Sequence, residues 1–366
     1  MNHSMAIIKK LRQAVISGAL PPGEVPVEDL KSCVELELET NKLTFLDPQF
    51  DSVMGIYRDL CGMVNKGETD SQKMLLFLLG LEQCLNTISD AVLSLVGREY
   101  WTMVHADKLP DPEIEEIIDF VERRKQVRLL PYDFVEDYLS LGCVVSLDED
   151  CGMSYVIHKG KRMYFPAKMN EREIADYYNV ILAEQDERSP HCYRMDGYNV
   201  KKGDVLVDVG GAEGFFTLYN IDIITKAYVF DADPDWFRAM EKTFAPYADK
   251  VELHFGYVGG VADGGQNITL DEVLAGVKVN YIKMDIEGYE KEALNGAKAL
   301  LERSDDLRCA ICAYHCEEDE KEIPELLGRM GMETAHSRGY MCPDWCNTGL
   351  LKAQLRRGVI FGRKKS

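Results

Sequence analysis

From residue 201 onward, short apolar segments alternate with segments of helical pattern, and this rhythm limits the folds that the chain can adopt. The expected strands are residues 204–209, 227–230, 251–255, 280–285 and 307–314. Strands that alternate with helices predict an α/β fold with a largely parallel sheet and helices on both faces. Two later segments, 332–337 and 357–363, are expected to close one edge as a hairpin. Since ligands gather at the carboxyl ends of such strands, the residues just after each strand are the candidates for a site.

The first 200 residues follow other patterns. Residues 1–128 are helical in pattern almost throughout, and we expect them to form a module whose helices mediate homodimerisation or cover a substrate. Residues 129–200 are expected to form a small antiparallel meander over 142–166 and then a connecting helix, because β-branched and aromatic residues surround polar turns there. Residues 201–366 hold the predicted sheet and are therefore the expected ligand-binding domain.

Charge and composition argue against several classes of protein. The 366 residues include 42 Lys and Arg against 62 Asp and Glu, and the net charge of −20 would repel a nucleic acid. The most apolar run, at 74–81, is shorter than the roughly 20 residues that cross a bilayer, so we expect no membrane span and a cytoplasmic location. The eleven cysteines are interpreted as reduced thiols. Cys309 and Cys312 would point to opposite faces of a strand, which argues against a shared zinc ion.

The first expected strand leads directly into three glycines, in DVLVDVGGAEGFFTL at 204–218. Glycine lets the backbone approach a ligand closely. The acids of this stretch argue against a pyrophosphate and for a cationic ligand group, such as the amino and sulfonium groups of S-adenosylmethionine. The candidate cofactor-binding residues here are Asp208, Gly210, Gly211, Glu213 and Gly214. A purely structural turn would explain the glycines about as well.

The ends of the second and third strands add to this case. Asp231 lies about 20 residues past the glycine loop, where a carboxylate accepts hydrogen bonds from both ribose hydroxyls of a nucleoside. Asp233 is the competing choice, but its place before Pro234 favours a helix N-cap. Gly256 and Tyr257 begin a glycine-rich loop that would line an adenine or only connect two elements.

The fourth strand carries the most unusual charges. Lys283, Asp285 and Glu287 alternate onto one face if the extended geometry persists through YIKMDIEG. Buried charges are costly unless they are paired or used, so we interpret them as part of a site. The alternative is a Lys–carboxylate ion pair, with Glu287 favouring the N-terminus of the next helix. His315 leaves the fifth strand at the same rim, where its pKa suits proton removal. His191, in SPHCY, precedes the core and is expected to fold over a cofactor.

Three stretches of the chain resemble the FkbM-type S-adenosylmethionine-dependent methyltransferases. They are GDVLVDVGGAEGFFTL, ITLDEVL followed by YIKMDIEGYEKEALNGAKALL, and CAYHCEEDEKEIPELLGRMGM. The resemblance covers about residues 189 to 363. It implies a class I methyltransferase (Rossmann-like) sheet of seven strands with the last one antiparallel, and methylation of oxygen, often on sugars or secondary metabolites. One departure is FDADP, where the family commonly has F-E-P, so the choice between Asp231 and Asp233 stays open.

We therefore expect an O-methyltransferase in which an acceptor hydroxyl attacks the methyl group of S-adenosyl-L-methionine in line. His315 is the expected base. Lys283 and Asp285 would orient the acceptor or tune the base, and Glu287 would support them. Asp285 is also expected to contact the cofactor. The acceptor is expected to be a small molecule or a glycan. A divalent metal held by Asp285, Glu287 and Asp263 is an alternative that is not favoured. An NAD-type oxidoreductase and a non-catalytic interaction protein are two further hypotheses from different classes of protein.

Overall fold

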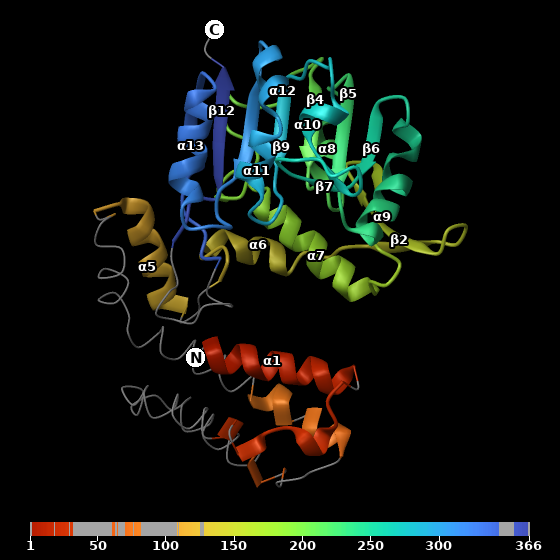
Figure 1. Cartoon of the computed structure of the whole chain (residues 1–366), viewed down its shortest axis with the longest axis vertical. Coiled ribbons are helices and arrows are strands. Elements are labelled where there is room, and N and C mark those ends of the chain that lie inside the picture. Colours follow the sequence, from red (N-terminus) through yellow and green to blue (C-terminus); the bar gives the residue numbers. More distant parts are fainter. Residues whose placement is uncertain are drawn as a thin grey trace. The chain divides into compact units, whose positions relative to one another are not determined.

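The main sheet of the computed structural model has seven strands in the order β11-β12-β10-β9-β4-β5-β6 (Figure 1). They are β4 (Val205–Val209), β5 (Lys226–Asp231), β6 (Val251–Phe255), β9 (Tyr281–Met284), β10 (Arg308–Cys312), β11 (Met332–His336) and β12 (Val359–Lys364). The first five pair in parallel, and β12 runs antiparallel to both β10 and β11. The structure thus confirms the predicted sheet and its hairpin, with β11 at the edge and β12 inside.

The structure describes part of the chain. The described residues are 2–17, 19–28, 30–31, 61–62, 64, 70–75, 77–81, 108, 110–124, 128–343 and 355–364. The chain divides into two compact units, one of residues 1–132 and 342–355 and the other of residues 133–341 and 356–366. The expected division at residues 128 and 200 stays a prediction.

Alternate residues of each strand pack on opposite faces of the main sheet. Leu206 faces α8 (Phe215–Asn220) and α9 (Pro234–Phe244). Val207 faces the other side, which is covered by α10 (Leu270–Val273), α11 (Glu290–Asn295), α12 (Lys298–Arg303) and α13 (Asp319–Arg329). Because both faces are covered, the inner strands β4, β9 and β10 are buried almost throughout. Cys309 and Cys312 pack on different faces, as expected, and the described cysteines are free thiols.

A smaller antiparallel sheet precedes the main one. Its strands are β1 (Val145–Asp148), β2 (Met153–His158) and β3 (Lys161–Tyr164), which confirms the expected meander. Helix α7 (Glu171–Glu184) follows and starts with a capping box between Asn170 and Glu173. Shorter elements of the same unit are η3 (Asp133–Val135), α6 (Glu136–Leu139), η4 (Ala245–Tyr247), β7 (Tyr257–Val258) and β8 (Asn267–Ile268).

The described residues of the N-terminal unit are mostly helical. Its elements include α1 (Asn2–Ile16), η1 (Pro22–Glu24) and α5 (Pro112–Arg124), and residues 71–75 and 77–81 are also helical. The Asp70 carboxylate accepts hydrogen bonds from two backbone amides and so caps the helical segment after it, while α5 begins at Pro112. Met74 and Phe77 are fully buried in the core of this unit.

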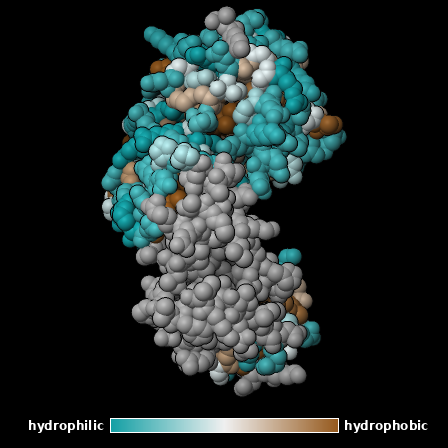
Figure 2. Space-filling model, turned by 90° about the vertical axis from the view of Figure 1, so that its left-hand side faces the viewer, coloured by the Kyte–Doolittle hydropathy of each residue, from teal (hydrophilic) through white to brown (hydrophobic). Residues whose placement is uncertain are grey.

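The surface of the described residues on the face that Figure 2 shows is mostly hydrophilic. None of the helices in the described ranges combines the length and the apolar character that crossing a membrane requires.

Candidate functional site

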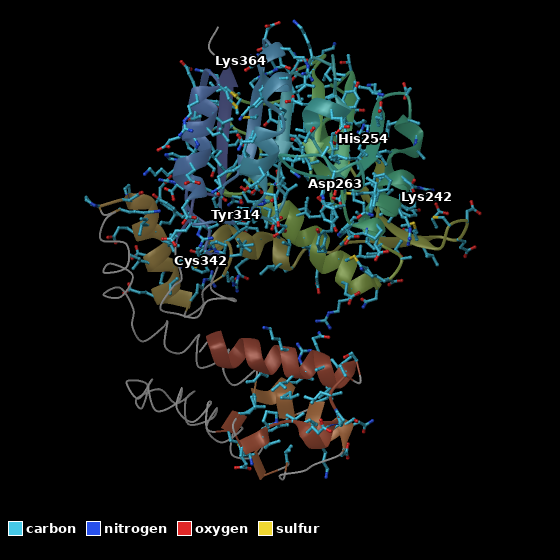
Figure 3. All side chains as sticks on the ribbon, in the orientation of Figure 1. Lys242, His254, Asp263, Tyr314, Cys342 and Lys364 are labelled. Carbon is cyan, nitrogen blue, oxygen red and sulfur yellow. The ribbon has the colours of Figure 1, made fainter. Side chains whose placement is uncertain are left out.

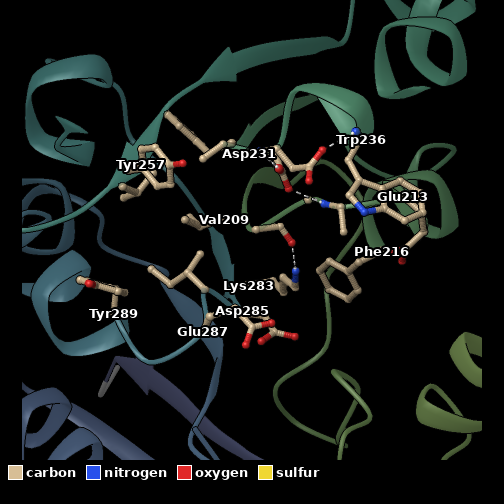
Figure 4. Close-up of a pocket in the computed structure, with 18 of the residues that line it drawn as sticks. Val209, Glu213, Phe216, Asp231, Trp236, Tyr257, Lys283, Asp285, Glu287 and Tyr289 are labelled. Atoms are coloured by element: carbon tan, nitrogen blue, oxygen red, sulfur yellow. Dashed lines mark hydrogen bonds between the residues drawn. The ribbon is translucent and has the colours of Figure 1, made fainter. Parts of the chain in front are cut away.

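A cavity of about 1100 Å³ opens at the carboxyl ends of the parallel strands. Tyr314 follows β10 at this end of the sheet, whereas Lys364, at the end of the antiparallel β12, lies at the opposite end (Figure 3). The predicted residues on the cavity wall are Gly210, Gly211, Glu213, Asp231, Gly256, Tyr257, Lys283, Asp285 and Glu287. Figure 4 shows Asp231 and Asp285 at opposite ends of the labelled group, with Val209 and Lys283 between them.

The glycine loop after β4 packs tightly against its neighbours. Gly210 has a φ of 76°, and a Cβ atom there would lie 1.8 Å from the backbone oxygen of Asp285. Gly214 also has a φ of 76°, but it lies before α8 and off the cavity wall, where a Cβ would meet the Phe244 ring at 2.7 Å. Gly210 and Gly211 thus bring bare backbone to the cavity, while Gly214 has a packing role.

Asp208 and Lys283 form a buried pair beneath this loop. The Lys283 Nζ lies 3.2 Å from the Asp208 Oδ1 and also donates to the carbonyl oxygen of Gly210. The Thr217 hydroxyl donates to the other Asp208 oxygen at 2.7 Å. Burial alone would lower the pKa of Lys283, but the Asp208 and Asp285 charges raise it. Asp208 is 1 % exposed and supports the loop from below, so a direct contact of its carboxylate with a cofactor stays a prediction.

Asp231 and Asp233 have separate roles at the end of β5. Asp231 lies on the cavity wall, and its two oxygens accept from the backbone amides of Ala212 and Asp233, each at 2.7 Å. Asp233 accepts from the amides of Asp235 and Trp236, which confirms it as the N-cap of α9. Burial raises the pKa of Asp231. Each Asp231 oxygen keeps a free lone pair, so this carboxylate is the one available to a diol.

Glu213 adds a second acid near Asp231. Burial raises the pKa of Glu213 to about 7, and the Tyr177 hydroxyl lies 3.3 Å from its Oε2. Tyr177 and Trp236 also line the cavity, with ring centroids 5.2 Å apart. Neither aromatic residue was expected at the site from the sequence.

The loop after β6 begins where it was expected. The Gly256 amide donates to the Asp231 backbone at 3.0 Å, and Tyr257 is 56 % exposed at the cavity. The Asp263 carboxylate is occupied within this loop, because it accepts from the Gly265 amide and the Asn267 side chain.

The turn after β9 corrects one expectation. The strand ends at Met284, and Glu287 and Gly288 both have positive φ, of 58° and 96°. The extended geometry therefore stops, and the side chain of Glu287 turns outward and is 91 % exposed. Glu287 was one candidate for the acid at the N-terminus of the next helix, but Glu290, the first residue of α11, has that place. The Glu290 carboxylate accepts a hydrogen bond from the Ile286 amide at 2.8 Å.

Asp285 is the centre of a polar cluster. The Tyr193 hydroxyl donates to its Oδ2 at 2.6 Å. His191 Nε2 lies 3.4 Å from the same oxygen, and His315 Nε2 lies 3.4 Å from Oδ1. Burial alone would raise the pKa of Asp285, but His191, Lys283 and His315 together lower it well below its usual range.

The two histidines of this cluster differ in their access to the cavity. His191 lines the cavity, together with Glu184 and Tyr314. His315 is not among the lining residues, and its Nδ1 faces the buried Glu290 Oε1 at 3.0 Å. Burial would lower both histidine pKa values, but the neighbouring carboxylates raise them. Tyr193, Tyr314 and Glu184 were missed from the sequence, although Tyr193 belongs to SPHCY.

Two groups of side chains have metal-ligand spacing among the described residues. They are His191, Asp285 and Cys312, and Asp285, Glu290 and His315, each with ligand atoms within 4.8 Å of one another. Neither Glu287 nor Asp263, which the metal alternative required, belongs to these groups. In the second group, His315 turns different ring nitrogens to Glu290 and Asp285, so one ion cannot bind all three through the atoms that now face each other.

Solved structures give distant matches to the chain. An FkbM methyltransferase from Methylobacillus flagellatus KT matches with 16% identity and a TM-score of 0.36 over 54% of this chain, which spans 56% of that protein. The precorrin-6y C5,15-methyltransferase of Geobacter metallireducens GS-15 matches with 11% identity and a TM-score of 0.33, over 55% of this chain and 93% of that one. A tRNA m1G37 methyltransferase from M. jannaschii has 13% identity and a TM-score of 0.33, over 59% and 58%. No curated protein matches the sequence.

The family comparison is more specific. Residues 204–341 match the model of the Methyltransferase FkbM domain. This range begins just before β4 and the glycine loop, includes Asp231 and Asp285, and ends after His315 and β11. Residues 204–341 are therefore a methyltransferase domain of the FkbM family, whose members use S-adenosylmethionine.

Proposed function

We propose that this protein transfers a methyl group from S-adenosylmethionine to a hydroxyl oxygen of a sugar, glycan or secondary metabolite. The observation that carries this proposal is the cluster at Asp285, where a cavity-lining histidine contacts a buried carboxylate. A hydroxyl must lose its proton as it becomes an ether, so an O-methyltransferase benefits from a base at the cavity wall.

The other end of the cavity fits the cofactor. Asp231 offers a carboxylate to the ribose hydroxyls, and the backbone at Gly210 and Gly211 allows close approach. The raised pKa of Glu213 reflects a buried acid without a full cationic partner, which favours a ligand with a positive charge. When bound, S-adenosylmethionine supplies an electrophilic methyl group. The residues of the chain hold the two reactants, exclude water and accept the proton.

The charge of the cavity supports a neutral acceptor. Its wall carries several carboxylates, namely Glu184, Glu213, Asp231, Asp233, Asp285, Glu287 and Glu292. The wall lysine, Lys283, is paired with Asp208 below the loop. A phosphorylated acceptor would meet unfavourable potential here, whereas a polyol would find many hydrogen-bond acceptors. The volume of about 1100 Å³ leaves room for an acceptor beside the cofactor.

Binding measurements test the cofactor first. We expect S-adenosylhomocysteine to bind in calorimetry and to raise the melting temperature, and NAD to do neither. Stabilisation by NAD alone would favour an oxidoreductase instead.

Product analysis then tests the reaction. With methyl-¹³C-labelled S-adenosylmethionine and a panel of neutral sugars and polyols, we expect an O-methyl signal in the NMR spectrum of the product. Labelled N-methyl or C-methyl products only, from a panel that also contains amines, would overturn the choice of oxygen. Activity that survives a chelator would argue against a metal-assisted reaction.

His315, the base expected from the sequence, has its own test. His315→Ala is expected to lower turnover while the protein still binds S-adenosylhomocysteine. Unchanged turnover would overturn the role of His315 as the base.

A further inference from the structure

The two histidines at Asp285 are not equivalent, because their second nitrogens meet different surroundings. His315 lies among three carboxylates, with Nε2 at 3.4 Å from Asp285 and 3.8 Å from Glu287, and Nδ1 at 3.0 Å from Glu290. Both ring nitrogens of His315 thus face an acid at 3.4 Å or less, whereas the acid that faces His191 Nδ1 is 3.9 Å away, and the closer arrangement favours the doubly protonated ring at His315. A ring in this state, behind the cavity wall, has no lone pair to offer an acceptor.

The two ring nitrogens of His191 differ, because one has hydrogen-bonding neighbours and the other has none among the described residues. Its Nε2 lies near Asp285 at 3.4 Å and the Tyr314 hydroxyl at 3.3 Å. Its Nδ1 has no hydrogen-bond partner within the described part of the chain, where the carboxylate oxygen that faces it, on Glu184, is 3.9 Å away. Both His191 and Glu184 line the cavity. An unpartnered buried nitrogen on the wall of a ligand cavity is where a hydroxyl can complete the hydrogen bonding.

The backbone holds this ring in place. The His191 amide donates to the Ser189 hydroxyl at 3.1 Å, and the Gln185 side chain donates to the His191 carbonyl at 3.3 Å. The ring also packs against Tyr193 and Tyr314, with centroids 5.1 and 5.3 Å away. His191 is therefore fixed between the end of α7 and the residues after β10. Proton transfer needs such a defined geometry.

We infer that His191 takes the proton of the acceptor through Nδ1, that Asp285 orients it through Nε2, and that His315 is a positioning residue for Asp285. This inference rests on the proposed function. In the step, the O–H bond of the acceptor breaks and its proton moves to Nδ1. The oxygen bonds to the methyl carbon as the carbon–sulfur bond breaks, and that electron pair stays on sulfur.

The groups around His191 suit a base that becomes positively charged. Glu184 from α7 and Asp285 after β9 are acids that stabilise the imidazolium. Lys283 opposes them, while Tyr314 and Cys312, on the β10 side, are neutral groups with raised pKa values. The balance favours proton uptake at this position over proton uptake by an isolated buried histidine.

The substitution His191→Gln separates the base from a structural role. The Gln amide can replace the Nε2–H donor toward Asp285, but it has no basic nitrogen in the place of Nδ1. We expect turnover to fall about a hundredfold or more, with binding of S-adenosylhomocysteine unchanged. His336→Gln, on the exposed side of β11, is the matched control and should leave turnover unchanged. Wild-type turnover in His191→Gln would overturn the inference.

His315→Gln tests the positioning role. We expect a turnover loss of less than about tenfold, because Gln still donates to Asp285. Losing the positive charge of His315 raises the pKa of His191, so the rising limb of the pH–rate profile should move to higher pH. A loss larger than that of His191→Gln would assign the base to His315 instead.

Histidine NMR gives a readout independent of activity. In the ¹⁵N-labelled full chain, we expect the neutral His191 ring to carry its proton on Nε2 and to titrate at Nδ1. A neutral ring with its proton on Nδ1 would overturn the inference without any acceptor. If the tautomer is as expected but no hydroxyl is methylated, the proposed function fails and the assignment of Nδ1 as the unpartnered nitrogen stands.

Discussion

The two ends of the cavity are built in different ways. At the Asp231 end, three loops follow β4, β5 and β6, and each contributes residues that come directly after a strand. At the Asp285 end, the side chains come from residues 189–193 before the sheet, from the turn after β9 and from the residues that follow β10. The geometry of the Asp231 end depends on many separate backbone contacts, whereas that of the Asp285 end depends on one carboxylate. We therefore expect graded losses at the first end and collapse of activity at the second.

The largest expected effect comes from Asp285→Asn. The amide keeps the volume but removes the charge that contacts His191 and His315, so both histidine pKa values should fall. We expect turnover to fall about a thousandfold, with S-adenosylhomocysteine still bound. Asp305→Asn is the matched control, because Asp305 is 81 % exposed and pairs with Lys278 at the surface. Turnover within a factor of about ten of wild type would contradict the dependence of the catalytic cluster on the Asp285 carboxylate.

Gly210→Ala tests the backbone that joins the two ends. Its positive φ costs an alanine about 1–2 kcal/mol, and the overlap of the new Cβ with the Asp285 backbone adds to that. Gly276→Ala is the matched control, since Gly276 has a φ of 77° but open space around its Cβ position. Denaturant unfolding should show a clearly larger loss for Gly210→Ala than for Gly276→Ala. Equal losses would mean that the contact of the loop with Asp285 carries no stability.

Asp231→Ala tests the cofactor end against a neighbouring acid. We expect the affinity for S-adenosylhomocysteine to fall about 10- to 100-fold, the usual effect of losing hydrogen bonds to a charged group. Asp233→Ala should instead cost about 1 kcal/mol of stability through the lost N-cap of α9 and leave affinity nearly unchanged. Calorimetry and denaturant unfolding on both variants separate the two effects. The reverse pattern would transfer the ribose contact to Asp233.

The sequence predicts the first end of the cavity better than the second. Strand ends converge in a parallel sheet, so Asp231 and Gly256 could be placed from strand order alone. The sequence does not show how far a side chain lies behind the wall of a cavity. Asp208 and His315 were placed correctly relative to β4 and β10, but their side chains lie behind the cavity wall. Glu287 was expected on the same face of the strand as Asp285, because an alternating sequence pattern does not indicate a turn with positive φ. Residues 189–193, before the sheet, are the hardest part of the site to predict. Their packing against the end of β10 brings His191 to the carboxylate of Asp285, which lies 94 residues later in the chain.

The smallest effect is expected at Glu213. Burial raises its pKa to about 7, and a cationic ligand favours the ionised form, so binding should release a proton. The affinity for S-adenosylmethionine, whose sulfonium carries the positive charge, should therefore rise about tenfold between about pH 6 and about pH 8. Glu213→Gln should flatten this rise, while Glu252→Gln, on β6 and off the cavity wall, should keep it. An unchanged slope in Glu213→Gln would assign the titrating group to His191, which also lines the cavity. In that case the cofactor end would share its protonation with the Asp285 cluster, and the two ends would act as one electrostatic unit.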